Sequence, residues 1–301
     1  MTTTTPPARR AAVLGQPVAH SLSPLLHRAA YAALGLEGWD YDAIEVAPDG
    51  LEAVIDGLDR SWAGLSLTMP HKQTVIPMLD HVEPLAEVVG AVNTVLVQGG
   101  GARPVLTGAN TDVHGIVAAV REAGNRQGSP DHQPAARTFS RGVVLGAGAT
   151  AASTLAALAQ LGCSDPVVLV RSLSRVGPLM RAAHRMGVEP TYALLAEAPD
   201  HLRAADLVVS TLPAHGADPV AEAVALAGVD RRHDGARPVL LDVVYDPRPT
   251  ALMTTLAGAG FVVVGGERML LHQAAEQVRL MTAREAPLAA MDAALRQRLD
   301  G

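Results

Sequence analysis

One type of side chain is nearly missing from this sequence, and its single occurrence is a candidate for chemistry. Of the 24 basic residues, 23 are arginine and only one, Lys72, is lysine. Arginine can supply a surface charge, but its guanidinium stays protonated, whereas a lysine amine can give up and take back a proton. Lys72 is therefore a candidate acid/base group. A coding bias against lysine is the alternative explanation, and the neighbouring residues must decide between the two.

A glycine-rich turn indicates a second function, the binding of a dinucleotide. After the apolar residues 143–145 come six turn residues: Gly146, Ala147, Gly148, Ala149, Thr150 and Ala151. Gly146 permits a tight turn, Gly148 lets backbone N–H groups approach a pyrophosphate, and Ala151 allows a helix to pack closely on the strand. The N-terminus of that helix then faces the diphosphate. An ordinary strand–helix turn is the alternative.

The end of the next expected strand indicates which dinucleotide is bound. A ribose 2′-hydroxyl is usually held there by a carboxylate, whereas a 2′-phosphate requires cations. Residues 169–175 contain no acid, but they contain Arg171, Ser172, Ser174 and Arg175. This composition favours NADP(H). The alternative is that both arginines are solvated charges at the start of a helix, where a cation is mildly unfavourable.

Strand-like and helix-like segments alternate along the chain, which predicts an α/β fold with two domains. Expected strands cover residues 11–15, 41–46, 63–67, 92–97, 104–106, 142–145, 167–170, 207–210, 239–243 and 261–264. A short helix is expected to begin at Pro70 and to carry Lys72. The last segment, 268–299, reads as one or two helices that Pro287 separates. The polar stretch 124–141 reads as a loop between the domains.

The composition is that of a soluble globular protein and excludes several classes. Hydrophobic residues make up 49% and charged residues 18% of the 301 positions, and the formal net charge is -6, which argues against a nucleic-acid binder. The only cysteine, Cys163, cannot form an intramolecular disulfide, as is typical of a reducing compartment. No signal-like segment and no run of eighteen apolar residues occurs. We therefore expect a cytoplasmic protein without membrane or nucleic-acid partners.

Six segments in order, together with the glycine-rich turn, resemble the shikimate dehydrogenase family, in particular its actinobacterial members. The segments are 15–24 (GQPVAHSLSP), 66–72 (SLTMPHK), 90–94 (GAVNT), 110–112 (NTD), 242–250 (DVVYDPRPT) and 266–274 (GERMLLHQA). Three departures from the family pattern occur. Ser66 replaces an asparagine, Ala149 replaces a glycine, and Val170-Arg171-Ser172 replaces Asn-Arg-Thr. The first departure leaves Thr68 and Lys72 in place, and the other two concern cofactor contacts.

The resemblance implies an NADP-dependent enzyme that reversibly reduces 3-dehydroshikimate to shikimate in aromatic amino-acid biosynthesis. It implies a substrate domain formed by residues 1–112 and 267–301, with the C-terminal helices packing back on it, and a Rossmann domain formed by residues 113–266. A homodimer is compatible with it. An NAD-dependent quinate/shikimate dehydrogenase is the close alternative, and a dinucleotide sensor without turnover is the more distant one.

The resemblance also assigns the residues of the site. Oxidation of a secondary alcohol releases a hydride and a proton, and the proton requires an acceptor. Lys72 is expected to be that group, or to polarise the hydroxyl, with Asp112 orienting it. The implied substrate residues are Ser21, Ser23, Thr68, Lys72, Asn93, Asp112, Tyr245 and Gln273. The implied cofactor residues are Gly146, Ala147, Gly148, Ala149, Thr150, Ala151, Arg171, Ser172, Arg175, Thr211, Val243, Gly266 and Met269.

Several of these residues have a purely structural alternative. Ser23 and Asp112 each precede a helical pattern and could serve as N-caps, Asn93 could belong to a turn, and Gln273 could lie on the surface. Four histidines, His20, His27, His71 and His272, show no metal-ligand spacing. We expect them in loops or on the surface, and we expect no metal.

Overall fold

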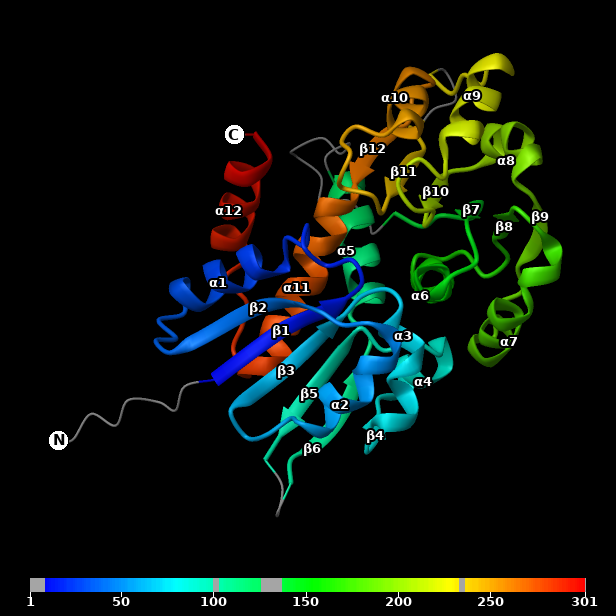
Figure 1. The fold of residues 1–301 in the computed structure, drawn as a ribbon. Helices are drawn as coiled ribbons and strands as arrows, with labels where there is room; N and C mark the ends of the chain where they lie inside the picture. Colours follow the sequence, from blue (N-terminus) through cyan, green and yellow to red (C-terminus); the bar gives the residue numbers. More distant parts are fainter. Residues whose placement is uncertain (1–8, 100–102, 126–136, 233–235, 301) are drawn as a thin grey trace. The chain divides into compact units, whose positions relative to one another are not determined.

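The chain divides into two compact units, each built around its own β-sheet. In the computed structural model, residues 9–99, 103–125, 137–232 and 236–300 are described (Figure 1). Unit 1 comprises Met1–Thr111 and Leu270–Gly301, and unit 2 comprises Asp112–Met269.

Unit 1 contains a mixed six-stranded sheet in the order β2-β1-β3-β5-β6-β4. The strands are β1 (Arg9–Gly15), β2 (Trp39–Glu45), β3 (Trp62–Leu67), β4 (His81–Val82), β5 (Thr94–Gln98) and β6 (Val105–Ala109). The three strands β2, β1 and β3 run parallel, and β5 is antiparallel to both of its neighbours, β3 and β6. Every residue of β3 is buried, because apolar clusters cover both faces of the sheet. Such two-sided burial explains the continuous apolar runs that predicted these strands.

Helices from both ends of the chain cover the sheet of unit 1. They are α1 (Ser23–Ala33), α2 (Leu51–Asp56), α3 (His71–Thr74), α4 (Pro84–Val89), α11 (Gly266–Thr282) and α12 (Leu288–Asp300). Helix α12 packs against α1, and Met281 of α11 belongs to the same apolar cluster as Ala11 and Val13 of β1. The C-terminal helices therefore pack back on the N-terminal unit, as expected. Their separation around Pro287 is also confirmed.

Unit 2 contains a fully parallel six-stranded sheet in the order β12-β11-β10-β7-β8-β9. The strands are β7 (Gly142–Leu145), β8 (Val167–Val170), β9 (Thr191–Leu194), β10 (Leu207–Ser210), β11 (Val239–Asp242) and β12 (Val262–Gly265). The helices are α5 (Asp112–Asn125), α6 (Ala149–Gln160), α7 (Gly177–Met186), α8 (Ala198–Ala204), α9 (Asp218–Leu226) and α10 (Ala251–Gly258). The strand order reverses at β7, and in such sheets ligands bind beyond the carboxyl ends of the strands at this point.

The expected two-domain α/β architecture is confirmed, but two edge strands were not predicted. Strand β9 is exposed or half-buried along its whole length, and β4 has only two residues. An edge strand packs on few neighbours, so its sequence shows neither a buried apolar run nor a clear alternation. The antiparallel pairing of β5 with β6 supports the expected hairpin, whose glycine turn lies largely outside the described residues.

Candidate active site

The segment that carries Lys72 begins where β3 ends beside β1. The backbone N–H of Thr68 donates to the carbonyl of Leu14 at 2.9 Å, and that of Gln16 donates to the carbonyl of Met69 at 3.0 Å. A Cβ atom at Gly15 would overlap Cγ2 of Thr68. Glycine at this position therefore lets the ends of the two strands approach closely, which places Thr68 against the loop that follows β1.

Helix α3 is anchored by a histidine that was expected at the surface. His71 is fully buried, and its Nε2 lies 2.8 Å from the carbonyl oxygen of Val46, so this nitrogen carries the proton. The carbonyl of Lys72 accepts from the N–H of Val92 at 2.7 Å, and the Lys72 side chain is half-buried. The expectation for His71 was wrong, because a single turn of helix supported on two sides buries the ring that precedes Lys72.

The two serines of the loop after β1 have different surroundings. The hydroxyl of Ser21, which is half-buried, accepts from the backbone N–H of Ser23 at 3.3 Å. Ser23 is buried as the first residue of α1, and Leu22 occupies the N-cap position without a side-chain capping bond. The alternative role of Ser23 as an N-cap is therefore wrong. Its hydroxyl instead lies near the phenol of Tyr41, a residue that sequence reasoning had not singled out.

Asn93 and Gln273 meet although 180 residues separate them in the chain. The side-chain Nδ2 of Asn93 donates to Oε1 of Gln273 at 3.1 Å and to the hydroxyl of Thr111 at 3.0 Å. The backbone N–H of Thr111 donates to Oδ1 of Asn93 at 2.8 Å, which fixes the orientation of that amide. Gln273 is half-buried, so its alternative description as a surface glutamine is not supported.

Asp112 is fully buried at the start of α5, where the chain passes from unit 1 to unit 2. Asn110, two residues earlier, donates to the carbonyl of Ala91 at 2.9 Å. This bond attaches the segment before α5 to the segment that follows α4. Lys72 and Asp112, the two residues expected to transfer the proton, thus belong to different units.

The glycine-rich turn of unit 2 joins β7 to α6. Gly146 has a φ of 110°, and a Cβ atom there would lie 2.6 Å from the hydroxyl oxygen of Thr211. Thr211 donates from both its N–H and its hydroxyl to the carbonyl of Leu145, at 2.9 and 2.8 Å. Gly146 is therefore required both by its backbone angle and by the closeness of Thr211. Ala151 is fully buried in the first turn of α6.

The N-terminus of α6 is suited to a diphosphate. Gly148 occupies the N-cap position without a side-chain capping bond, and a Cβ atom built there meets no atom within 4 Å. The first N–H groups of a helix lack partners inside the helix and carry a partial positive charge, so they bind anions well. Ala149 and Thr150, the first two residues of α6, are both half-buried.

The segment after β8 presents cations without carboxylates. Arg171 and Arg175 are exposed, and the hydroxyls of Ser172 and Ser174 lie 2.9 Å apart. Within the described ranges, neither guanidinium has a carboxylate partner. Two unpaired guanidiniums with two hydroxyls fit the 2′-phosphate of NADP(H).

A buried carboxylate holds the turn after β11, which carries Val243 and Tyr245. Asp242 is buried, and it accepts from the hydroxyl of Thr250 at 2.8 Å and from the N–H of Val244 at 3.3 Å. Burial raises the pKa of the Asp242 carboxyl above its usual value. Thr250 in turn caps α10 by accepting from the N–H of Met253. The 242–250 motif thus has a structural role that sequence reasoning had not given it.

The start of α11 is fixed by close packing and by an ion pair. A Cβ atom at Gly266 would overlap the carbonyl oxygen of Val243, so only glycine lets the two segments approach this closely. Arg268 donates to both carboxylate oxygens of Glu122 on α5, each at 2.9 Å from Nη2. Met269, also expected to contact cofactor, is buried.

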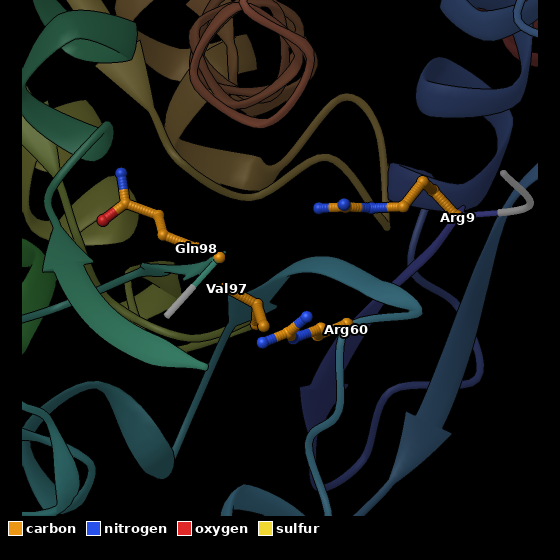
Figure 2. Close-up of a pocket in the computed structure, with 5 residues that line it drawn as sticks. Arg9, Arg60, Val97 and Gln98 are labelled. Atoms are coloured by element: carbon orange, nitrogen blue, oxygen red, sulfur yellow. The ribbon is translucent and has the colours of Figure 1, made fainter. Parts of the chain in front are cut away.

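A cavity of about 160 Å³ lies elsewhere in unit 1 and is lined by Arg9, Arg60, Val97, Gln98 and Gly99 (Figure 2). None of these is among the expected site residues. Among the residues that the structure describes, no three histidine, cysteine or carboxylate side chains are arranged to hold a metal ion. No helix in the same ranges is long and apolar enough to cross a membrane.

Matches to known families cover most of the chain. Residues 13–95 match the shikimate dehydrogenase substrate binding domain, residues 135–256 match the shikimate / quinate 5-dehydrogenase family, and residues 266–296 match the shikimate 5′-dehydrogenase C-terminal domain.

Full-length relatives agree with these matches. The chain is 38% identical to the shikimate dehydrogenase (NADP(+)) of Moorella thermoacetica, covering 95% of this chain and 92% of the relative. The crystal structure of Mycobacterium tuberculosis shikimate dehydrogenase is 36% identical, with a TM-score of 0.81 over 96% of this chain and 99% of the other. A quinate dehydrogenase from Corynebacterium glutamicum in complex with NAD is 26% identical, with a TM-score of 0.79 over 96% of this chain and 99% of the other. The chain belongs to the shikimate dehydrogenase family.

Proposed function

We propose that the protein catalyses the reversible, NADP-dependent interconversion of shikimate and 3-dehydroshikimate. The observation that carries this proposal is the hydrogen bond between Asn93 and Gln273. Two amides from distant segments, each with donor and acceptor atoms, are held together near the helix that carries Lys72. Such groups suit a polyhydroxylated ring, because each hydroxyl can both donate and accept. Curated relatives that are 33–38% identical over nearly the whole chain are named shikimate dehydrogenase (NADP(+)).

Different residues of the proposed site bind different groups of the substrate. Ser21 and Ser23 offer hydroxyls to the carboxylate, and Thr68, Asn93 and Gln273 offer hydrogen bonds to the ring hydroxyls. These five residues lie in unit 1. Tyr245 is a further proposed substrate contact. We accordingly propose that residues 1–112 and 267–301 form the substrate domain and that residues 113–266 form the NADP domain.

In the oxidation direction the substrate C3 hydroxyl loses a proton while its carbon loses a hydride. When bound, NADP+ supplies the hydride acceptor. The Nζ of Lys72, as a free amine, takes the hydroxyl proton and returns it in the reduction direction. Asp112 orients this amine and binds a neighbouring hydroxyl of the substrate.

The cofactor residues fit NADP(H) on three separate observations. The uncapped N-terminus of α6 and the open space at Gly148 suit the diphosphate, and the cations at Arg171 and Arg175 suit the 2′-phosphate. Ser172, Thr211, Val243, Gly266 and Met269 complete the proposed contacts, with Ala147, Ala149, Thr150 and Ala151 around the turn. The missing carboxylate after β8 is the feature that disfavours the NAD-dependent quinate alternative.

The test is absorbance at the reduced-nicotinamide band, with shikimate or quinate and NADP+ or NAD+, in parallel for the wild type and Lys72→Ala. We expect fast turnover of shikimate with NADP+ and slow turnover of the other three combinations. The variant should show almost no turnover. Preference for quinate or NAD+ would favour the quinate dehydrogenase alternative. Cofactor binding without turnover of either acid would contradict the proposed enzymatic activity and favour a dinucleotide sensor.

Two further expectations accompany this proposal. A cytoplasmic location suits an enzyme of aromatic amino-acid biosynthesis and is tested by cell fractionation. A homodimer is tested by light scattering on the purified protein, and a mass near 31.2 kDa would show a monomer instead.

A further inference from the structure

A buried glutamine lies one helical turn beyond Gln273 and is outside the proposed substrate contacts. Gln277 is 3% exposed, and its side chain is surrounded by polar groups in the interior of unit 1. These groups form what we call the buried amide network. Its members are His27, Tyr41, Ser66, Gln277, Thr94 and Asn93. A buried polar group destabilises the folded state unless it forms hydrogen bonds. A network of this size inside unit 1 therefore indicates a function beyond stability.

The direction of hydrogen bonding at Gln277 is set by a backbone carbonyl. The carbonyl oxygen of Asn93 can only accept, and it lies 3.4 Å from Nε2 of Gln277, which therefore must be the nitrogen. The oxygen Oε1 of Gln277 then faces the other way, 2.9 Å from the hydroxyl of Ser66 and 3.3 Å from Nε2 of His27. Both of those groups consequently donate to it.

His27 is compatible with that assignment only as a neutral donor. The ring is fully buried and stacks on Tyr41 with centroids 3.9 Å apart. Burial lowers the pKa of His27 to about 3, although the bond to Gln277 opposes the shift. His27 is therefore uncharged at neutral pH with its proton on Nε2, and its expected position at the surface was wrong.

The bonds on the other side of Gln277 lead to a proposed substrate residue. The Nε2 of Gln277 donates to the hydroxyl of Thr94 at 3.0 Å, so Thr94 gives its own proton to Oδ1 of Asn93 at 2.9 Å. The backbone N–H of Thr111 donates to the same oxygen, so the Nδ2 of Asn93 faces Gln273 and binds its Oε1. The amide nitrogen of Gln273 is thereby turned away from Asn93 and offered as a donor.

The bonds through Ser66 lead to a buried phenol. The phenol of Tyr41 donates to Ser66 at 2.6 Å. One amide, that of Gln277, thus connects Ser66 and Tyr41 with the two amides proposed for the ring hydroxyls. Ser66 is one of the three departures from the family pattern, and it makes the central bond on this side.

We infer that Gln277 is a positioning residue that, together with the backbone N–H of Thr111, sets the hydrogen-bonding direction of Asn93 and Gln273 for the substrate. This inference rests on the proposed function, because those two residues are substrate contacts only in that proposal. A solely structural role would need Gln277 to be polar and buried, but not to donate toward Asn93 in particular. The positioning role and the structural role therefore differ in whether Gln277 must donate toward Asn93.

The first test compares Gln277→Glu with Gln277→Met at several pH values. A buried carboxylate cannot donate to Asn93 or Thr94, so we expect the KM for shikimate to rise about tenfold at pH 8, as the loss of one buried hydrogen bond would cause. A buried carboxyl has a raised pKa, and its protonated form can donate again. The KM of the glutamate variant should therefore fall back toward that of the wild type near pH 6, whereas the methionine variant should show no recovery.

The KM for NADP+ should stay within twofold in both variants, since the proposed cofactor contacts lie in the other unit. Gln98→Glu is the matched control, because Gln98 is exposed on β5 and bonds only outside the network. Equal KM values for shikimate in the wild type and in both Gln277 variants, or the same loss without pH recovery in both, would overturn the inference. Failure of the wild type to oxidise shikimate would instead overturn the proposed function.

A second pair of variants keeps the inference testable if the Gln277 variants do not fold. Thr94→Val has nearly the same shape but removes the hydroxyl that relays the direction to Asn93, whereas Thr94→Ser keeps the hydroxyl. We expect a roughly threefold higher KM for shikimate in the valine variant and a value near that of the wild type in the serine variant. Equal KM values in the two variants would overturn the inference.

Discussion

The proposed substrate and cofactor sites are built in opposite ways. In unit 1 the recognising groups are side chains, and Asn93 and Gln273 come from segments 180 residues apart. In unit 2 the diphosphate would be bound by backbone N–H groups of one continuous turn, where Gly146 and Gly148 matter because they have no side chain. Backbone recognition needs a shape, whereas recognition of hydroxyls needs donors and acceptors placed in a defined direction. The two sites should therefore respond to different kinds of mutation.

The largest expected effect separates chemistry from binding. Lys72→Met should lower kcat for shikimate about 10³-fold, because a general acid/base residue typically contributes 10² to 10⁴. The dissociation constant for NADP+, measured by calorimetry, should stay within twofold. Lys72→Arg keeps the charge but cannot take the proton, so it should be nearly as slow. An arginine variant with more than a tenth of wild-type turnover would show that charge alone suffices.

The next effect tests the side-chain part of the cofactor site. The double variant Arg171→Ala with Arg175→Ala should raise the KM for NADP+ roughly ten- to hundredfold, since each charge-assisted hydrogen bond contributes about 1.5–3 kcal/mol and is weakened by solvent here. The KM for NAD+ should change little. Arg181→Ala, an exposed arginine on α7, serves as the control. Equal losses with both cofactors would mean that the two arginines do not recognise a 2′-phosphate.

A pair of glycine variants tests the part of the cofactor site that is formed by the backbone. Gly146→Ala should lower the free energy of unfolding by about 2 kcal/mol, because φ is 110° and the added Cβ would crowd Thr211. Gly148→Ala should leave stability within about 0.5 kcal/mol, since its backbone is extended and the Cβ meets no protein atom. It should nevertheless raise the KM for NADP+ several-fold by obstructing the pyrophosphate.

Denaturant unfolding and steady-state kinetics on the same two preparations check this pair. If both alanines destabilise the fold equally, or if Gly148→Ala binds NADP+ normally, then the distinction between the two glycines is not valid.

The smallest effect concerns the pH dependence of unit 1. The pKa of His27 is about 3 in the folded chain and near 6.5 when unfolded, so between these values the unfolded state binds the extra proton. Stability should therefore be complete above pH 6.5 and fall as the pH drops toward 3, with a slope of up to about 1.4 kcal/mol per pH unit from this group. His27→Phe keeps the stacking on Tyr41 and should remove that part of the slope.

Denaturant titrations between pH 7 and pH 4 measure the contribution of His27 to this slope. The control is His81→Gln, because His81 is exposed. An unchanged slope in His27→Phe would show that His27 is protonated in the folded state.

The sequence predicted the central strands of both sheets well, and it predicted the environment of the histidines poorly. Buried strands such as β3 and β7 are continuous apolar runs, so composition alone indicated them. His27 and His71 were expected at the surface, yet both are fully buried. A histidine is buried only where a partner accepts its proton, and those partners, Gln277 and the carbonyl of Val46, lie 250 and 25 residues away. No local pattern contains that information.

Gln277 itself could have been noticed, because it follows Gln273 by one helical turn and so lies on the same face of the helix. Its role in the network could not have been predicted, because the spacing does not show that Ser66, Thr94 and His27 surround it.

The sequence by itself determined the features that depend on consecutive residues: the glycine turn at Gly146, the cations at Arg171 and Arg175, and the lone amine of Lys72. Their chemistry follows from residue type and from the backbone conformation of a few neighbouring positions. Only the tertiary structure decided the direction of the hydrogen bonds around Asn93, Gln273 and Gln277. The reason is that an amide can point either way, and the fixed backbone carbonyl and N–H groups that choose its direction come from distant segments.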